Sequence, residues 1–288
     1  MANLLAPWPK ERFGAALTAR TALSYGYVWK HRPRRTPADL ADAHFEQLRQ
    51  TLQLMELQGL VLDAGCGGGV DLVRMASCDG VNVIGLELSH RGCLASQAQI
   101  RGRPNAHVFQ GDVARMPFAD GQFDFVYSYG VLHHLADTEA GMRELVRVTK
   151  PGGRVAIYLY EDFIEREALW RWLLTLTNSL RAVTVRLPRP LLYALCLAAA
   201  PMTFVGFTLP HRFLRAFTAT RAFAQTIPFR HAPSPFSLAA DLYDRFATPI
   251  ERRFTRDKAL ALCARGGLSA LSIARARGWM VTGTKPAG

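Results

Sequence analysis

A run of glycines directly after a short apolar segment is the strongest constraint on the fold of this chain. Val61 and Leu62 lead into Asp63, and glycines follow at positions 65, 67, 68 and 69. Glycine is favoured where a backbone turns tightly or approaches a ligand closely. The pattern predicts a buried strand, a turn nearly free of side chains and a helix over 70–76, an arrangement typical of a nucleotide site.

Further apolar segments follow this turn and alternate with segments of helical pattern. The predicted strands after the first are residues 81–86, 107–110, 123–127 and 154–160. A helix is predicted over 138–148, and a turn over 150–153 because these residues contain Pro-Gly-Gly. The last predicted elements are a helix over 256–265 and an antiparallel pair, 268–275 and 279–284, around Arg277-Gly278. This order predicts an α/β fold, with a mostly parallel sheet and helices on both faces.

Polar residues stand where these strands end, which is the edge at which parallel sheets bind ligands. Glu87 ends the second strand about twenty residues after the glycine turn, where an acid can accept hydrogen bonds from ribose hydroxyls. Asp112 follows the third strand, and His133 and His134 follow the fourth, after Tyr129. The sequence therefore predicts one site that is built from several strand ends.

Residues 55–160 resemble a class I S-adenosylmethionine-dependent methyltransferase. The matching elements are the Asp63 to Gly69 loop, Glu87, Gly111-Asp112, Leu132-His133-His134 and Pro151-Gly152-Gly153. The resemblance implies a seven-stranded, mostly parallel sheet with helices on both faces. Residues 163–236 do not fit a minimal domain of this kind, so a helical cap inserted between strands 5 and 6 is predicted there. Residues 24–29 also resemble an aromatic segment found ahead of the cofactor domain in some bacterial small-molecule methyltransferases, with Tyr25 and Val28 as departures.

The resemblance implies S-adenosyl-L-methionine as the cofactor and suggests a role for each matching residue. The glycines Gly65, Gly67 and Gly69 would pass along its methionine part, and Asp63 would hold its amino group. Glu87 would bind the ribose hydroxyls, Asp112 the adenine amino group, and Val113 would lie beside the ring. Tyr129 and Leu132 would form walls near the sulfonium. Taken singly, Asp63 could instead cap the turn, and Asp112 could be a turn residue before Pro117.

A base is needed if the acceptor is a hydroxyl or an ammonium group. His134 is the preferred base and His133 the second choice, because an imidazole titrates near neutrality without special tuning. The alternative is structural, with one histidine packed under the cofactor and the other exposed. Tyr25 is a third catalytic candidate, as part of an amino-terminal lid. The predicted substrate contacts are Tyr160, Glu161 as a partner for an amine, Tyr243 and Arg252.

A nicotinamide-dependent dehydrogenase is the main alternative for the glycine pattern. Such enzymes place a pyrophosphate on Gly-x-Gly-x-x-Gly, whereas the position of the third glycine is Val70 in this chain. No Tyr-x-x-x-Lys or comparable hydride-transfer pair is recognisable later in the sequence. The methyltransferase interpretation is therefore preferred.

Four regions are predicted along the chain. They are an amino-terminal helical lid over 1–54, a cofactor-binding core over 55–162, an inserted helical cap over 163–236 and a return to the core over 237–288. Residues 1–169 hold 18 Lys/Arg and 19 Asp/Glu, whereas residues 170–288 hold 17 Lys/Arg and 4 Asp/Glu. The second half is thus strongly basic, which suggests nucleic acid, an anionic membrane or an anionic substrate as a partner.

A run without charged side chains covers residues 191–209. About twenty apolar residues suffice to span a bilayer, but Pro201 interrupts this run. Two short helices, 191–200 and 202–209, folded over the active site are therefore preferred, followed by interfacial membrane contact and then by a true span. Arginines over 181–221 flank the run and suit either anionic lipid or an acidic acceptor.

The five cysteines form an odd number without a Cys-x-x-Cys pair, which argues against a disulfide framework and favours a reducing compartment. The first ten residues lack the long apolar core of a signal peptide. We therefore expect a cytoplasmic protein, with peripheral membrane contact as an alternative. No carboxylate cluster in the sequence suggests a metal, and the oligomeric state is left open.

These features together predict a methyltransferase for a small apolar or amphiphilic acceptor, with or without an anionic group. Transfer to oxygen, nitrogen or carbon is left open, and bacterial secondary metabolism or lipid and quinone-type chemistry fits best by resemblance. Nucleic acid is disfavoured, since residues 128–131 lack the Asn/Asp-Pro-Pro-Tyr/Phe turn of base and glutamine amino-group methylases. An RNA methyltransferase and a noncatalytic cofactor-binding or membrane-associated accessory protein are the alternatives.

Overall fold

The computed structural model describes residues 14–31, 44–51, 57–225, 227, 229, 232, 234–276 and 278–287. The chain forms two compact units. The core unit contains the residues up to Trp29, Arg34–Arg171 and Pro249–Gly288, and the inserted unit contains Lys30–Pro33 and Trp172–Thr248. The first ten residues, which the sequence analysis distinguished from a signal peptide, lie outside the described residues. The same holds for Arg277 in the predicted turn before the last strand.

The core unit is built on one seven-stranded sheet with the order β3-β2-β1-β4-β5-β7-β6. Its strands are β1 (Gly59–Ala64), β2 (Val81–Glu87), β3 (Ala106–Gln110), β4 (Phe123–Tyr129), β5 (Thr149–Leu159), β6 (Ser269–Arg275) and β7 (Trp279–Thr284). The first five strands run parallel, and β7 is antiparallel to both β5 and β6. The predicted fold and the closing antiparallel pair are therefore confirmed.

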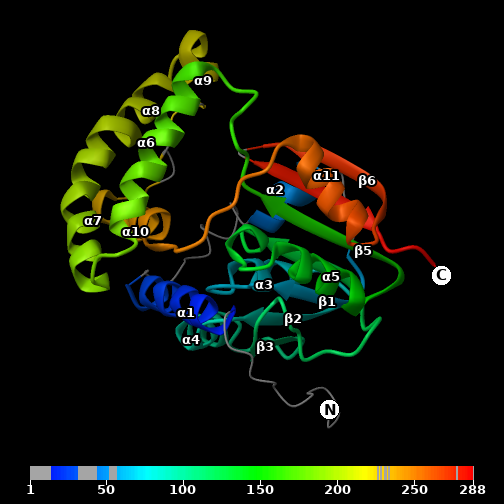
Figure 1. Ribbon diagram of the computed structural model, residues 1–288. Coiled ribbons are helices and arrows are strands. Elements are labelled where there is room, and N and C mark those ends of the chain that lie inside the picture. Colours follow the sequence, from blue (N-terminus) through cyan, green and yellow to red (C-terminus); the bar gives the residue numbers. More distant parts are fainter. Residues whose placement is uncertain are drawn as a thin grey trace. The chain divides into compact units, whose positions relative to one another are not determined.

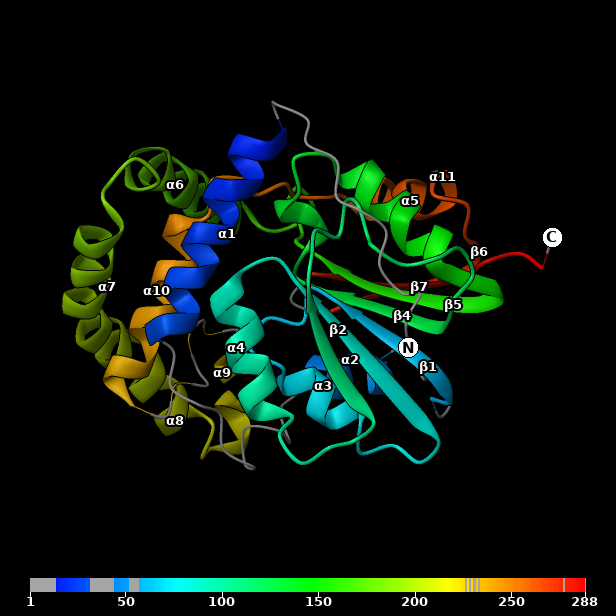
Figure 2. The same ribbon diagram turned by 90° about the horizontal axis from the view of Figure 1, so that it is seen from below.

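Helices cover both faces of this sheet, as Figure 2 shows. The helices of the core unit are α1 (Gly14–His31, of which the last two residues belong to the inserted unit), α2 (His44–Thr51), α3 (Val70–Met75), α4 (His90–Gln99), α5 (Thr138–Val148) and α11 (Arg256–Arg265), together with the short turn η2 (Leu132–His134). Helices α5 and α11 pack on one face, and α2 and α3 on the other.

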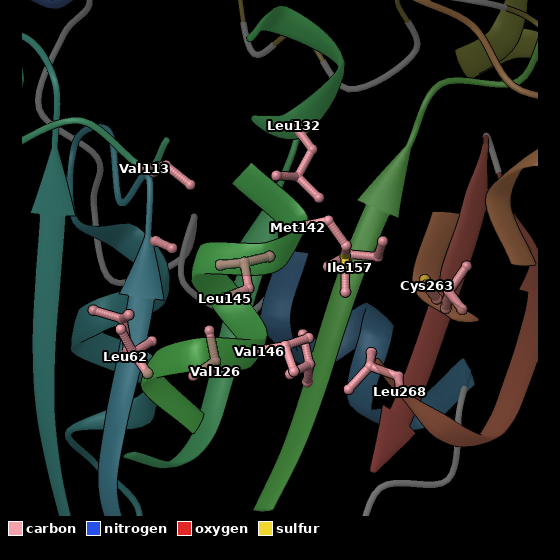
Figure 3. Close-up of a cluster of buried hydrophobic side chains, with 14 of the residues drawn as sticks. Leu62, Val113, Val126, Leu132, Met142, Leu145, Val146, Ile157, Cys263 and Leu268 are labelled. Carbon is pink, nitrogen blue, oxygen red and sulfur yellow. The ribbon is translucent and has the colours of Figure 1, made fainter. Parts of the chain in front are cut away.

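The face covered by α5 and α11 carries the larger core cluster (Figure 3). Leu62 of β1, Val126 of β4 and Ile157 of β5 meet Met142 and Leu145 of α5 there, all of them buried. Because strands buried on both faces are apolar throughout, these strands appear in the sequence as short continuous apolar runs. This rigid core fixes the strand ends at which the polar residues lie.

Strand β5 is longer than the sequence predicted. It begins at Thr149 rather than at residue 154, and it ends at Leu159. Residues 150–153 were expected to form a turn, but the Gly152 N–H donates to the Lys285 carbonyl at 2.8 Å and Gly153 accepts from the Lys285 N–H at 2.9 Å. Pairing with the chain after β7 therefore keeps the Pro-Gly-Gly stretch within the strand as a bulge, in which Gly152 has a φ of +76° and the register with β4 shifts.

The inserted unit is helical (Figure 1). Its elements are α6 (Ala168–Thr184, which begins in the core unit), α7 (Arg189–Thr203), the π-helical turn η3 (Phe204–Thr208), α8 (Leu209–Leu214), η4 (Thr218–Thr220), α9 (Arg221–Ala224), η5 (Pro235–Ser237) and α10 (Leu238–Ala247). The boundary at Thr248 assigns α10 to this unit, whereas the sequence placed residues after 236 in the core. The difference arises because α10 packs against α7.

The prediction of two helices separated at Pro201 is wrong. Helix α7 continues through Pro201 into η3 and α8, and the resulting helix, Arg189–Leu214, has 26 residues. Proline removes one backbone donor and crowds the preceding turn, and the wider π-helical turn that follows absorbs this local misfit. By length and composition the helix could cross a membrane, a test that core helices of soluble proteins also pass.

Candidate functional site

The glycine turn lies at the carboxyl end of β1 and is held to β2. The amides of Gly65 and Cys66 both donate to the Leu86 carbonyl, at 2.7 and 3.1 Å. Gly65, Gly67 and Gly69 have φ values of +94°, +54° and +78°, a region that disfavours other residues. The conformation of the backbone therefore requires glycine at these positions, as the sequence analysis expected.

Helix α1 of the amino-terminal segment packs on this turn. A Cβ atom added at Gly67 or Gly68 would lie 2.5 or 2.7 Å from the indole ring of Trp29. The Tyr25 ring from the same helix stands edge-on to His134, with ring centroids 5.9 Å apart. The predicted aromatic segment therefore lies against the glycine turn, and Trp29 is a site residue that the sequence interpretation did not single out.

Glu87 accepts three hydrogen bonds at the end of β2. Its carboxylate takes the Gly67 N–H at 3.1 Å, the Ser89 N–H at 2.9 Å and the Ser89 hydroxyl at 2.7 Å. Ser89 is also the N-cap of α4, where its Oγ accepts from the Gly92 N–H. Burial raises the pKa of Glu87 above its ordinary value, although these hydrogen bonds act to lower it. The acid thus links the glycine turn to the start of α4.

Asp63 is a buried acid at the carboxyl end of β1. Its side chain is 2% exposed, and its Oδ2 has no hydrogen-bond partner among the residues that the structure describes. Burial, and then the negative charges of Asp71 and Glu87, raise its pKa well above the ordinary value. A buried carboxyl group without a partner is costly, so a cationic ligand group at this position would relieve both burial and repulsion.

A second acid, Asp71, lies on α3 beneath the turn and was missed at the sequence level. It accepts from the Phe45 N–H at 3.0 Å and from the Tyr127 hydroxyl at 3.1 Å, and His44 Nδ1 lies 3.7 Å from its Oδ2. Burial raises the pKa of Asp71, but the hydrogen bond and charge of His44 and these other donors bring it below the ordinary value. Asp71 therefore anchors α2 to the site.

An aromatic stack forms the wall next to these acids. The Tyr129 ring stacks on Tyr158 with centroids 4.2 Å apart, and the His44 ring stacks on Tyr129 at 4.3 Å. Tyr129 was expected to wall the site, whereas His44 and Tyr158 come from a helix and a neighbouring strand that the sequence did not connect with it. This wall is a flat apolar surface with polar edges.

Asp112 and Val113 follow β3, as expected from their positions. Asp112 Oδ1 accepts from the Ala114 N–H at 2.9 Å, and burial raises the pKa of this carboxyl group. Val113 is 5% exposed and belongs to the core cluster in Figure 3. Asp112 is therefore a turn residue, and its second carboxylate oxygen has no hydrogen bond among those made by the described residues.

The two histidines after β4 differ in their surroundings. His133 is fully buried, and its ring stacks on Tyr160 with centroids 3.8 Å apart. His134 Nδ1 lies 2.6 Å from the Ile250 carbonyl oxygen. Because a carbonyl only accepts, the neutral His134 ring carries its proton on Nδ1, and Nε2 is the basic nitrogen. Both side chains are buried, so the structural alternative with one exposed histidine does not hold in this form.

Arg252 holds this segment in place from residues far along the chain. Its backbone N–H donates to the His133 carbonyl at 2.9 Å, and its guanidinium donates to the Ala136 carbonyl at 2.6 Å and to Thr138 Oγ1 at 3.2 Å. These contacts fix η2, and the predicted contact of Arg252 with substrate stays a prediction. These contacts satisfy backbone groups of a buried turn.

Glu161 was predicted to bind an amine, and the structure gives it other partners. Its buried carboxylate pairs with Arg166 at 2.8 Å and with Arg275. Burial raises the pKa of Glu161, but the hydrogen bonds and charges of these arginines lower it below its ordinary value. The geometry favours a structural role that ties β6 to the segment after β5.

Residues 62–157 match the sequence profile of a family described as "Methyltransferase domain". Two similar proteins are the demethylmenaquinone methyltransferase of Beutenbergia cavernae, 41% identical over 98 residues, and the 27-O-demethylrifamycin SV methyltransferase of Amycolatopsis mediterranei, 35% identical over 103 residues. These stretches cover 34% of this chain and only 39% and 37% of those relatives. Residues 62–157 form a class I methyltransferase domain.

The fold has a solved counterpart over most of its length. A possible exported protein from Bordetella parapertussis superposes with a TM-score of 0.50 at 15% identity, and the match covers 93% of this chain and 80% of that one. At this identity the likeness concerns the fold alone.

The methyltransferase domain implies S-adenosyl-L-methionine as methyl donor, and the residues present fit this group. Its amino acid part carries an ammonium, which suits the Asp63 oxygen that has no partner among the described residues. The glycine turn and the oxygens of Glu87 and Asp112 offer the backbone approach and acceptors that a nucleoside needs. Tyr243, the remaining predicted substrate contact, belongs to the inserted unit and is fully buried there beside Tyr193.

Proposed function

We propose that this chain is an S-adenosylmethionine-dependent methyltransferase for a small acceptor that is apolar or amphiphilic. The observation that carries the proposal is Asp63, a buried carboxylate beside a glycine turn in a methyltransferase domain, with one oxygen that no described residue partners. The cofactor, when bound, supplies an activated methyl group, and the protein contributes binding, orientation and a place for the proton.

Cofactor binding is assigned to the strand ends already described. Asp63 holds the ammonium, Glu87 holds ribose hydroxyls with the lone pairs that its three present donors leave, and Asp112 accepts from the adenine amino group. The stacked ring of Tyr129 lies at the wall of the same edge. Trp29 of α1 packs against the glycine turn, and Tyr25 of the same helix lies beside His134.

His134 is the residue that would accept the proton of a hydroxyl or ammonium acceptor. Its hydrogen bond to the Ile250 carbonyl fixes the tautomer, so that Nε2 has the lone pair needed by a general base. The fully buried His133 ring packs on Tyr160 instead. The two histidines thus have different roles, with His134 as the base and His133 as packing.

The nature of the acceptor follows from the chain as a whole. The two relatives described above are named as methyltransferases of small molecules. The inserted unit of this chain is apolar and rich in arginine. An acceptor of hydrocarbon character, with or without an acidic group, fits this composition. Demethylmenaquinone and 27-O-demethylrifamycin SV appear in the names of those relatives, and neither is assigned to this chain as its acceptor.

Calorimetric titration with S-adenosylhomocysteine tests the cofactor site first. We expect micromolar binding by the wild type and about 100-fold weaker binding by Asp63→Ala and Glu87→Ala, because each removes a charged hydrogen-bond acceptor. Absence of binding by folded wild-type protein would refute the proposal and direct the search to dinucleotides. Salt-sensitive binding of RNA would instead favour a nucleic-acid acceptor.

A screen of apolar acceptors then tests catalysis. For any hydroxyl or amine acceptor that it finds, we expect His134→Ala to lower kcat by about 100-fold while S-adenosylhomocysteine binds as before. An unchanged kcat for the His134→Ala variant would refute the role of His134 as general base. Cofactor binding without turnover on any acceptor would favour a noncatalytic accessory protein.

A further inference from the structure

The outer side of the Arg189–Leu214 helix is apolar along its whole length. Its exposed stripe, between 43% and 77% exposed, consists of Leu191, Leu195, Met202, Val205, Leu209 and Phe213. Its buried stripe consists of Leu192, Cys196, Ala200, Phe204, Thr208 and His211. Successive members are three, four or, between Leu195 and Met202, seven residues apart, which are helical spacings, so the two sets lie on opposite sides of the helix. A helix on a soluble surface normally has polar residues on the outer side.

Helix α6 has a polarity opposite to that of a soluble surface helix. Its one buried side chain is Arg181, whose Nε donates to the Thr248 carbonyl at 3.2 Å. Its exposed side chains include Trp172, Leu173, Leu176, Leu180 and Val183. Thr184 of the same helix donates to the Phe246 carbonyl at 2.9 Å. The polar contacts of α6 therefore face the rest of the inserted unit, while its tryptophan and leucine side chains face outward.

The charge of this segment has a single sign. Residues 168–240 contain eight arginines and no aspartate, glutamate or lysine. Arg186, Arg215 and Arg221 are exposed and flank the apolar stripe at its two ends in the sequence. The partner of such a surface must combine an apolar layer with negative charge.

An anionic lipid bilayer has this combination, and the alternatives fit less well. A second copy would oppose arginine to arginine without an acid in residues 168–240 to pair them. Nucleic acid would match the arginines but leave the exposed leucines without a partner. A membrane span would expose to lipid the buried side, where Thr208 and His211 bind the carbonyls of Phe229 and Ala224.

We propose that the inserted unit docks on the surface of an anionic lipid bilayer, with the Arg189–Leu214 helix lying in the plane of the interface. At about 1.5 Å per residue, the helix would lay roughly 39 Å of apolar edge on the lipid, with arginines at the headgroups. The inference rests on the inserted unit and does not depend on the methyl acceptor.

Vesicle co-sedimentation of the full-length protein tests this proposal, using phosphatidylcholine vesicles with and without phosphatidylglycerol. The apolar variant is Met202→Gln with Val205→Gln, and its matched control is Leu23→Gln with Leu94→Gln, two exposed leucines of the core unit. The charge variant is Arg215→Gln with Arg221→Gln. Thermal melting confirms that each variant is folded.

We expect binding to vesicles that contain phosphatidylglycerol, a decrease with added salt, and about tenfold weaker binding by the apolar and charge variants but not by the control. Failure of the folded wild type to bind anionic vesicles would overturn the proposal. Equal binding by the apolar variant and the wild type would do the same. Protein that resists extraction by alkaline carbonate would indicate a span in place of surface docking.

Discussion

The methyltransferase domain and the inserted unit differ in which of their groups are unfavourably placed: polar groups in the interior of the first and apolar groups on the surface of the second. In the domain, acids are buried at the sheet edge, and Asp63 has an oxygen without a partner among the described residues. In the inserted unit, α6 buries an arginine and exposes leucines. Buried polar groups without partners indicate a small ligand, whereas exposed apolar groups indicate a large surface.

The largest expected effect on stability concerns Glu161, a buried acid of the core unit. Glu161→Gln should lower the free energy of unfolding by about 3 kcal/mol, because two arginines lose their buried partner. Urea unfolding measures this loss. The exposed Glu139, paired with Arg265, is the control, and Glu139→Gln should change stability by less than about 0.5 kcal/mol.

The same variant also has a pH signature. The pKa of Glu161 is lowered in the folded protein, so its contribution is present above the ordinary carboxyl pKa and is lost as the pH falls through the folded-state value. The difference between wild type and Glu161→Gln should therefore shrink in acid. An unchanged stability at neutral pH, together with an altered KM for an amine acceptor, would restore the substrate role.

Glycines of the two units should respond in opposite directions to alanine. Gly67→Ala should destabilise the protein by about 2 kcal/mol, since φ is +54° and Trp29 occupies the space of the new Cβ atom. Gly206→Ala, in a helical turn with open space around it, should stabilise by up to about 1 kcal/mol. Thermal melting of both variants, with S-adenosylhomocysteine titration, tests the pair, and equal effects would contradict the comparison.

Asp63→Asn should stabilise the cofactor-free protein while it weakens cofactor binding. The pKa of Asp63 is raised by folding, so its favourable contribution is complete below the ordinary carboxyl pKa and is lost as the pH rises through the folded-state value. The amide cannot ionise, and we expect a gain of about 1 kcal/mol near neutral pH that vanishes in acid. A destabilised variant at neutral pH would show that the charged carboxylate has a partner.

The smallest effect is expected on the outer face of the inserted unit. Met202→Gln should change the free energy of unfolding by less than about 0.5 kcal/mol, since the side chain is 77% exposed. Denaturant unfolding measures this value. A loss of several kcal/mol would mean that Met202 is buried in the native protein, and the distinction between the two units would then fail.

The local part of this fold could be predicted from the sequence. The turn after β1, the strand runs and the glycine positions follow from short-range patterns, because positive φ and buried strands select residue types one position at a time. The elements with weak or conflicting patterns were misjudged. Pro201 was taken as a helix end, and residues 150–153 as a turn, because each is decided by neighbours distant in sequence.

The sequence by itself determined the sheet, the glycine turn and the acids at the strand ends of this protein. Only the tertiary structure decided which of those groups have partners. His134 meets Ile250 across 116 positions, Glu161 meets Arg275 across 114, and Asp71 meets Tyr127 across 56. Such contacts depend on where the chain returns after the inserted unit and how strands align. A residue type at one position specifies a capacity for hydrogen bonding, whereas the packed fold supplies or withholds the partner.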